Sequence, residues 1–197
     1  MGIKEQGAKP TGLLGKITWR MMNQYHTSFY IDVFKNRLPA SHSKILDIGC
    51  GGGRFLKFLA NKNETYFLYG LDHSPEMVAL SKRVNKKAAR QGRMEIIQGS
   101  VTQIPHEGSS LDLVTAFETV QFWPDIGRSF SEIYRVLKAG GNLIIINRYP
   151  PEGSTWWETA RIKSSNGYIR ELEQAGFRQV ITDLSFRKGW IIVVAEK

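Results

Sequence analysis

Short apolar runs alternate along the chain with segments in which apolar residues recur at helical spacing. The runs, rich in β-branched residues, predict seven strands. These are Lys44–Ile48, Phe67–Asp72, Met94–Gln98, Leu111–Ala116, Asn142–Asn147, Gln179–Ser185 and Trp190–Ala195. Helical patterns lie between most of them. Strands and helices that alternate in this way predict an α/β protein, a three-layer sandwich with helices on both faces of a largely parallel sheet.

Capping residues mark where the predicted helices begin and end. Ser74-Pro75-Glu76 supplies a cap, a proline at the first helical position and a carboxylate in the first turn, so a helix should start directly after Asp72. Asp125 similarly precedes a helical pattern that includes Leu137. We expect this second helix to end at Gly140-Gly141, because glycine commonly follows the last helical turn.

The last two predicted strands follow one another directly. After a helix predicted over Gly167–Ala175, the segments Gln179–Ser185 and Trp190–Ala195 are joined by Phe186–Gly189 alone. A connection this short makes an antiparallel hairpin. The sequence therefore predicts a seven-stranded, mostly parallel sheet that finishes with a C-terminal antiparallel hairpin.

The N-terminal part of the chain has a pattern of its own. Apolar residues recur at helical spacing from Thr11 to Leu38, and Pro39 marks a stop. One or two amphipathic helices should thus precede the first strand, behind a mobile tail that extends to about Pro10. We divide the chain into residues 1–40, a tail with a helical segment, and residues 41–197, the sheet domain.

Composition narrows the cellular setting. The 197 residues are 42% hydrophobic, enough for the core of one domain, and include a single cysteine, Cys50. A disulfide framework and a zinc-type cysteine pair are therefore not expected. The sequence shows no signal-peptide pattern and no apolar run of about 20 residues. These features predict a cytoplasmic protein without a membrane span.

Charge widens the choice of partners. Lys and Arg total 27 against 18 Asp and Glu, so the formal charge is +9. Such a balance makes nucleic acid or an anionic membrane surface possible partners. Much of the excess of basic residues falls on one side of the helix predicted after Asp72. This side is either a solvated helix face or an RNA-binding patch. The residues concerned are Lys82, Arg83, Lys86, Lys87 and Arg90.

The segment ILDIGCGGG, Ile45–Gly53, ends the first predicted strand with an acid and a glycine-rich loop. A Walker-type phosphate loop requires Gly-Lys-Ser/Thr after its spacer, whereas Arg54 follows Gly53, so a nucleoside triphosphate site is excluded. A dinucleotide fingerprint counted from Gly49 requires glycine at position 54, which weakens a pyrophosphate site. The pattern that fits is Asp-x-Gly-x-Gly-x-Gly, formed by Asp47, Gly49, Gly51 and Gly53.

Several motifs together resemble the class I S-adenosylmethionine-dependent methyltransferases, in particular the small-molecule group (methyltransferase type 11) that includes the quinone-biosynthesis methyltransferases. ILDIGCGGGRF resembles the cofactor loop, and YGLDHSPEMV the second strand with its terminal acid. IIQGSVTQIPHEGSSLDLVTAFETVQFW resembles the third and fourth strands, and VLKAGGNLIII the turn into the fifth. The resemblance covers roughly Ser43–Ile146. It implies a Rossmann-like fold, S-adenosylmethionine as cofactor, S-adenosylhomocysteine as product, and a helical lid within residues 1–40.

The resemblance also implies which residues contact the cofactor. Asp72 is placed to accept both ribose hydroxyls, or to cap the helix that follows. Asp47 could hold the methionine ammonium group or order the glycine loop. Ser100 stands where the family usually has an acid for the adenine amino group, and its alternative role is that of a turn residue. The expected cofactor contacts are Asp47, Gly49, Cys50, Gly51, Gly53, Asp72, His73, Met77, Ser100, Val101 and Phe117.

Methyl transfer from a sulfonium is a direct displacement, which needs no metal and little side-chain chemistry. Glu118 could act as a base, offset the sulfonium charge or cap a helix, and His26 is a second candidate base or a structural residue. Expected acceptor contacts are Tyr25, Gln121, Trp123 and Tyr149, although an aromatic residue such as Trp123 is more often part of a core. The four histidines lack metal-ligand spacing, so no metal is expected.

The expected function is methyl transfer to a small-molecule acceptor, with N, O, S and C acceptors all open. The second hypothesis is an RNA methyltransferase, which the basic charge favours. The Asn-Pro-Pro-aromatic motif of amino-group methyltransferases is, however, missing after the fourth strand. The third hypothesis is a non-catalytic scaffold that binds the cofactor. Ser100 favours it, because this residue replaces the acid that the family usually has at the position. A nicotinamide oxidoreductase comes last because Arg54 occupies the third glycine position. The acceptor and the oligomeric state are left open by the sequence.

Overall fold

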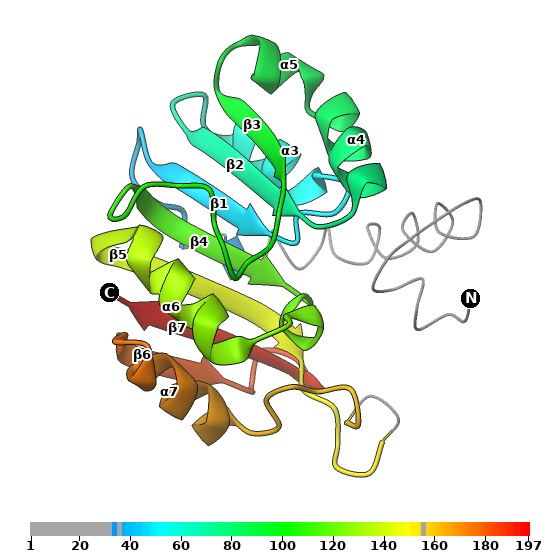
Figure 1. Cartoon of the computed structure of the whole chain (residues 1–197), viewed down its shortest axis with the longest axis vertical. Coiled ribbons are helices and arrows are strands. Elements are labelled where there is room, and N and C mark those ends of the chain that lie inside the picture. The colour runs from blue at the N-terminus through cyan, green and yellow to red at the C-terminus, as the bar shows by residue number, and fades with distance from the viewer. Residues whose placement is uncertain (1–32, 35–36, 155–156) are drawn as a thin grey trace. The chain divides into compact units, whose positions relative to one another are not determined.

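The computed structural model describes residues 33–34, 37–154 and 157–197. Their seven strands form one sheet in the order β3-β2-β1-β4-β5-β7-β6 (Figure 1). The strands are β1 (Lys44–Ile48), β2 (Phe67–Asp72), β3 (Met94–Gln98), β4 (Leu111–Phe117), β5 (Leu137–Arg148), β6 (Arg178–Asp183) and β7 (Trp190–Glu196). The pairs β2–β3, β1–β4 and β4–β5 are parallel, whereas β7 is antiparallel to both β5 and β6. The predicted fold class is therefore confirmed.

The helices follow the predicted alternation. They are α3 (Arg54–Lys62), α4 (Pro75–Val84), α5 (Lys86–Arg90), the 3-10 helix η1 (Val120–Phe122), α6 (Ile126–Val136) and α7 (Ser165–Gln174). Contacts divide the chain into two compact units. Within the described residues, one unit contains the chain up to Ser43 together with Cys50–Gln98, and the other combines Lys44–Gly49 with Gly99–Lys197. The proposed division at residue 40 stays a prediction because residues 1–32 lie outside the described part.

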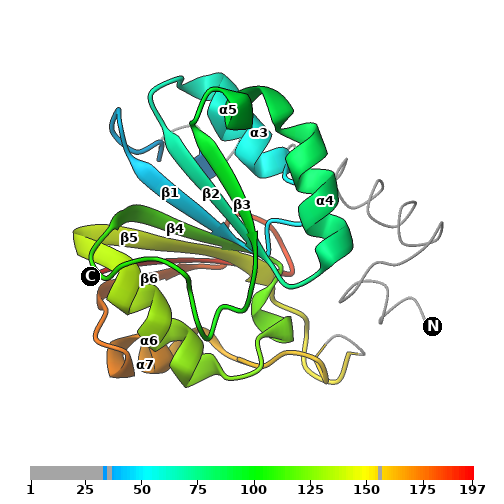
Figure 2. The ribbon, with the colours of Figure 1, turned by 45° about the horizontal axis from the view of Figure 1, so that its top comes forward.

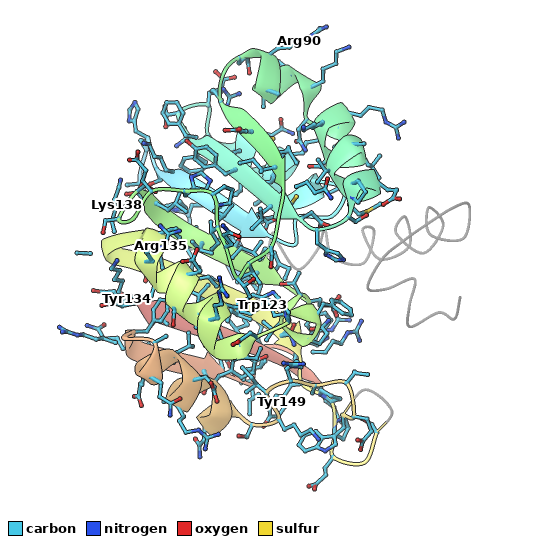
Figure 3. The ribbon with its side chains drawn as sticks, in the orientation of Figure 1. Arg90, Trp123, Tyr134, Arg135, Lys138 and Tyr149 are labelled. Atoms are coloured by element: carbon cyan, nitrogen blue, oxygen red, sulfur yellow. The ribbon has the colours of Figure 1, made fainter. Side chains whose placement is uncertain are left out.

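The first unit contains β2 and β3 with α3, α4 and α5. Helix α4 begins as predicted: the Met77 N–H donates to the Ser74 hydroxyl at 3.3 Å, and Pro75 occupies the first helical position. The predicted basic face is solvent-exposed, and the helix carrying it is divided at Asn85 into α4 and α5. Arg90 of α5 points away from the ribbon (Figure 3). The basic residues thus form a solvated face in this structure.

The second unit has its core between the sheet and the helices α6 and α7, which lie side by side on one face (Figure 2). Phe130 and Ile133 of α6 and Leu172 of α7 have no exposed surface, and the central strand β5 is buried from Leu143 to Asn147. Helix α7 begins at Ser165, two residues before the predicted start, because the Ser164 hydroxyl accepts the Gly167 N–H at 3.0 Å.

The end of α6 differs from the sequence prediction. The helix stops at Val136, and Leu137, which we placed in the helix, is extended and pairs with Leu111 of β4. Gly140 has φ +73° and donates its N–H to the Lys197 carbonyl, so the glycine pair lies inside the long strand β5 and does not end a helix. Complete burial of Leu137 against the sheet accounts for the earlier change of conformation.

A pair of charged residues on α6 anchors the connection between β3 and β4. Glu132 accepts the Ile104 N–H at 2.9 Å, and Arg135 donates to the carbonyls of Ile104 and His106. Arg135 also forms an ion pair with Glu132, with 2.8 Å between Nε and Oε1. Its hydrogen bond to the carboxylate is the largest of the effects that lower the pKa of Glu132.

We expect Glu132→Gln to lower the free energy of unfolding by about 1 kcal/mol near neutral pH, because the charged hydrogen bonds to Arg135 are weakened. The folded-state pKa of Glu132 lies below its unfolded value, so this stabilisation is present above the unfolded pKa of 4.5 and is lost as pH falls through the folded-state pKa. Urea unfolding at neutral pH and at about pH 3 measures the change, with the exposed Glu107→Gln as control. A difference from wild type that does not vary with pH contradicts the assignment.

Candidate functional site

The glycine-rich loop after β1 contains three residues in the left-handed region, where side chains are disfavoured. Gly49, Gly51 and Gly53 have φ values of +68°, +50° and +73°. A Cβ atom at Gly49 would lie 2.2 Å from the Thr119 side chain, whereas a Cβ at Gly51 would meet none of the described residues within 4 Å. Packing within the protein thus requires glycine at position 49, whereas packing against the described residues does not account for the glycine at position 51.

Two polar residues of the first unit hold the end of the glycine loop. Ser81 is fully buried and Asn85 is 3% exposed, and a Cβ at Gly53 would lie 2.1 Å from the Ser81 hydroxyl. The Asn85 side-chain amide donates to the Gly53 carbonyl at 2.9 Å. Our sequence predictions missed both residues. The available signal was their i, i+4 spacing on the buried side of an otherwise amphipathic helix.

Asp72 connects the glycine loop to the start of α4. Its Oδ2 accepts the Gly51 N–H at 2.8 Å, its Oδ1 accepts the Ser74 N–H at 2.9 Å, and the residue is 7% exposed. A carboxylate has about four acceptor positions, so these two bonds leave capacity for hydroxyl donors. The neighbouring His73 is largely exposed, with its Nδ1 3.8 Å from Asp72 Oδ1. The cap of α4 is Ser74, so Asp72 does not cap the helix, and its expected role at the ribose stays a prediction.

Two other expected cofactor contacts of the first unit are buried within it. Cys50 and Met77 are 8% and 6% exposed, and the Cys50 sulfur lies against Gly70, where it would be 2.9 Å from an added Cβ. The Cys50 backbone N–H donates to the Leu71 carbonyl at 3.1 Å. Cys50 therefore packs as a small residue between the loop and β2.

In the second unit, Asp47 lies at the end of β1 and is 3% exposed. Its Oδ1 accepts a hydrogen bond of 2.8 Å from the Thr115 hydroxyl on β4. The side chain is thus oriented by the neighbouring strand at the point where the glycine loop begins. A buried, oriented carboxylate suits either the binding of an ammonium group or the ordering of the loop.

Ser100 forms a turn after β3. Its hydroxyl lies 2.8 Å from the Thr102 hydroxyl and accepts the Thr102 N–H at 3.2 Å, while its carbonyl accepts the Gln103 N–H. Val101 is buried. These bonds correspond to the turn residue that we considered as the alternative, and the adenine contact of Ser100 stays a prediction.

Glu118 directly follows β4 and has the unusual φ of +49° for a residue other than glycine. Its N–H donates to the Ile146 carbonyl of β5 at 2.8 Å, and its side chain, 8% exposed, forms an ion pair with Arg148. The Arg148 guanidinium lies 4.5 Å from the centre of the Trp190 ring. Left-handed non-glycine residues gather at functional sites, where the surrounding structure holds the strain.

The ion pair orients the Glu118 carboxylate. The Arg148 guanidinium that holds it comes from the end of the neighbouring strand β5. Arg148 and Trp190 were absent from our candidate residues. Arg148 follows the buried run of β5 directly, and its position at the carboxyl end of a parallel strand is the signal that could have identified it.

The other expected residues of the second unit have different surroundings. Gln121 donates to the Glu118 carbonyl at 2.6 Å, and Phe117 is half-buried at the end of β4. Trp123 is 4% exposed and packs edge-to-face on Phe130, with ring centres 5.5 Å apart. The Tyr149 N–H donates to the Gly189 carbonyl at 2.8 Å. Trp123 and Tyr149 can be located in Figure 3. Trp123 is therefore a core residue in this structure.

Helix α7 contributes a buried tyrosine to the second unit. Tyr168 of α7 is 1% exposed, and this burial raises its pKa, while a hydrogen bond with Asn147 acts in the opposite direction. The phenol therefore stays protonated near neutral pH.

Some expectations fall outside the described residues. His26 and Tyr25 lie in the part of the chain that the structure does not describe. In the described ranges, no group of three or more His, Cys, Asp or Glu residues could hold a metal ion. The helices in those ranges include none that is long and apolar enough to cross a membrane.

Comparison with known proteins identifies the family. Residues 46–145 match the methyltransferase domain. The chain belongs to this family. The match runs from β1 into β5 and includes Asp47, the glycine loop, Asp72 and Glu118. The family expected from the sequence motifs is thereby confirmed.

Curated methyltransferases are similar to this chain over most of its length. A demethylmenaquinone methyltransferase from Oceanobacillus iheyensis is 30% identical over 65% of this chain and 54% of its own. A chloroplastic 2-methyl-6-phytyl-1,4-hydroquinone methyltransferase from Oryza sativa is 29% identical over 70% of this chain and 42% of its own. The chain thus spans about half the length of these relatives.

Solved structures share the fold of this methyltransferase-domain protein. An S-adenosylmethionine-dependent methyltransferase from Aquifex aeolicus has a TM-score of 0.69 and 23% identity, over 84% of this chain and 88% of its own. A geranyl diphosphate C-methyltransferase from Streptomyces coelicolor, solved with S-adenosylhomocysteine, has a TM-score of 0.72 and 15% identity, over 86% and 77% of the two chains.

Gly53→Ala should lower the free energy of unfolding by about 2 to 3 kcal/mol, because the new methyl group meets Ser81 and Asn85 in addition to the φ strain. Gly51→Ala should cost only about 1 kcal/mol, because the new methyl group meets none of the described residues and the φ strain acts alone. Gly92→Ala, which has a similar φ in open space, is the control. Urea unfolding measures all three, and equal losses at positions 51 and 53 would disprove the packing argument.

A double-mutant cycle tests the ion pair of Glu118 with Arg148. Arg148→Gln alone should lower the free energy of unfolding by about 2 kcal/mol, because it leaves the carboxylate buried without its cation. Adding Glu118→Gln should restore part of this loss, with a coupling of about 1 kcal/mol or more by chemical unfolding. Strictly additive effects of the two substitutions would contradict the coupling.

Proposed function

We propose that this protein is an S-adenosylmethionine-dependent methyltransferase that transfers a methyl group to a small-molecule acceptor by direct displacement. The family match over residues 46–145 carries the proposal. The open approach to Gly51, beside the buried carboxylate of Asp72, supports it from the structure. When bound, the cofactor supplies a methyl group on a sulfonium centre, and S-adenosylhomocysteine is the product.

The residues present fit the cofactor. We assign to Asp72 the binding of the ribose hydroxyls, with His73 and Met77 beside the same strand end. We assign close approach of the ligand to the backbone at Gly51, with Cys50 and Gly53 as its neighbours in the loop. In the second unit, we assign Asp47, Gly49 and Phe117 to the remainder of the cofactor and Ser100 and Val101 to the adenine. Buried carboxylates that keep acceptor capacity match the hydroxyl and ammonium groups of such a ligand.

Glu118 acts in this proposal through position and charge more than through proton transfer. Displacement at a sulfonium depends mainly on alignment of the acceptor and exclusion of water. Pairing with Arg148 supports a role in shaping the loop after β4, where Gln121 bonds the Glu118 carbonyl. His26 remains the proposed candidate for a base.

The acceptor is proposed to be a lipid-soluble small molecule. The relatives named above act, by their names, on demethylmenaquinone and on 2-methyl-6-phytyl-1,4-hydroquinone. The acceptor contacts expected from the sequence are Tyr25, Gln121, Tyr149 and Trp123. Of these, Trp123 is buried against Phe130. The atom that is methylated stays open among N, O, S and C.

We place the protein in the cytoplasm, where a reducing environment suits Cys50, the single cysteine of the chain, which is buried. RNA is the second candidate acceptor, and the exposed basic face of α4 and α5 favours it. The chain could alternatively bind the cofactor without catalysis. Activity assays with small lipid-soluble acceptors and with transfer RNA, each with labelled cofactor, separate the three alternatives.

Asp72→Asn should weaken the binding of S-adenosylmethionine and S-adenosylhomocysteine by about tenfold or more, because two charge-assisted hydrogen bonds to the ribose are replaced by weaker ones. Calorimetric titration measures this, with NADH as the negative ligand. Asp125→Asn removes the same charge and keeps a capping residue at α6, so it serves as the matched control. Equal affinity of wild type and Asp72→Asn would refute the ribose role, and no binding to wild type would refute the cofactor.

A further inference from the structure

The turn between β6 and β7 exposes apolar and basic side chains together. Leu184 and Phe186 are 43% and 37% exposed, and Arg187 and Lys188 that follow them are also exposed. We call residues 184–188 the hairpin tip. Asp183 fixes the turn, because its Oδ1 accepts both the N–H and the hydroxyl of Ser185 at 2.7 Å. The carboxylate at the base of the tip is thereby engaged within the turn.

The hairpin tip lies at the carboxyl end of β5. Gly189, directly after the tip, accepts the Tyr149 N–H, and the next residue, Trp190, pairs with Arg148. The loop after β4 begins at the same end of the sheet, since Phe117 pairs with Ile146. These positions place the tip at the end of the second unit where we propose that the acceptor is held.

Among the described residues, the exposed basic face of α4 and α5 includes no exposed large apolar side chain, and Leu80 and Val84 are half-buried. The basic residues of α4 and α5 are exposed, while Met77, Val78 and Ala88 of these helices are buried. Within the second unit, Phe122 of η1, 41% exposed, adds an apolar side chain at the carboxyl end of β4. Apolar side chains beside Lys and Arg are the combination that binds the interface of an anionic bilayer, whereas a basic face alone suits general electrostatic attraction.

We infer that the hairpin tip is a docking surface for an anionic lipid bilayer. Leu184 and Phe186 enter the headgroup region, and Arg187 and Lys188 contact anionic headgroups. The formal charge of +9 for the whole chain favours approach to such a surface. The inference deepens the proposed function, on which it rests: docking by the tip brings the acceptor end of the second unit to the compartment that holds a lipid-soluble acceptor.

Vesicle co-sedimentation tests the inference without an activity assay. Wild type should bind vesicles of phosphatidylcholine with about one quarter phosphatidylglycerol, bind pure phosphatidylcholine much more weakly, and lose affinity as salt rises. Leu184→Ser with Phe186→Ser should weaken binding about tenfold or more, because the apolar insertion is lost. Arg187→Gln with Lys188→Gln should weaken it by about thirtyfold.

A matched control removes the same charge elsewhere. Lys86→Gln with Lys87→Gln, on the exposed face of α5, should change vesicle affinity less than threefold. If this control loses as much affinity as the tip variants, or if the tip variants bind like wild type, the inference is overturned. Absence of binding by wild type to anionic vesicles also overturns it.

Two further measurements distinguish bilayer docking from self-association and from cofactor binding. Ile181 on the edge strand β6 is 63% exposed, so Ile181→Thr and sedimentation velocity test pairing of two copies through that edge. A dimer that Ile181→Thr or the Leu184/Phe186 variant dissociates would assign the tip to self-association and overturn the inference.

Calorimetry with S-adenosylhomocysteine should give wild-type affinity for all tip variants. Vesicle binding without affinity for that ligand would refute the proposed function and leave the docking surface standing.

Discussion

The carboxylate of Asp72 is the interaction on which the candidate cofactor region of the first unit depends. One oxygen accepts the Gly51 N–H and the other accepts the Ser74 N–H, so a single side chain holds the glycine loop and the start of α4. Its near-complete burial strengthens these bonds and makes their loss costly. A residue with such a structural role can still bind a ligand, because each oxygen keeps a further acceptor position.

The glycine loop shows why sequence patterns reveal a site more readily than the packing around it. The spacing of Gly49, Gly51 and Gly53, together with the motifs of the later strands, indicated the correct family, but it suggested that a ligand explains all three glycines. In the structure the Thr119 side chain explains Gly49, and Ser81 with Asn85 explains Gly53. These neighbours are distant in sequence from the loop, and a single sequence contains no signal that joins them to it.

Local signals predicted the fold well where they agreed with tertiary packing. Strands β1, β2 and β3 have the predicted bounds, and Ser74 and Asp125 cap the expected helices. The prediction failed at Leu137, where a helical pattern ran on but pairing with β4 imposed an extended backbone. The ion pair between Glu118 and Arg148 was likewise beyond local signals, because the alignment of β4 with β5 creates it. Candidate residues in the undescribed N-terminal segment stay predictions.

The second unit combines a rigid strand end with a strained residue. Glu118 keeps its left-handed backbone because its N–H is bonded to β5 and its carboxylate to Arg148, which in turn lies on the Trp190 ring. Three parts of the chain that are remote in sequence therefore determine one loop conformation. A change in this loop therefore involves the segments after β4 and β5 and the start of β7 together. In the proposed function these segments hold the acceptor, so its identity depends on contacts among them, whereas each cofactor motif can be recognised within one stretch of sequence.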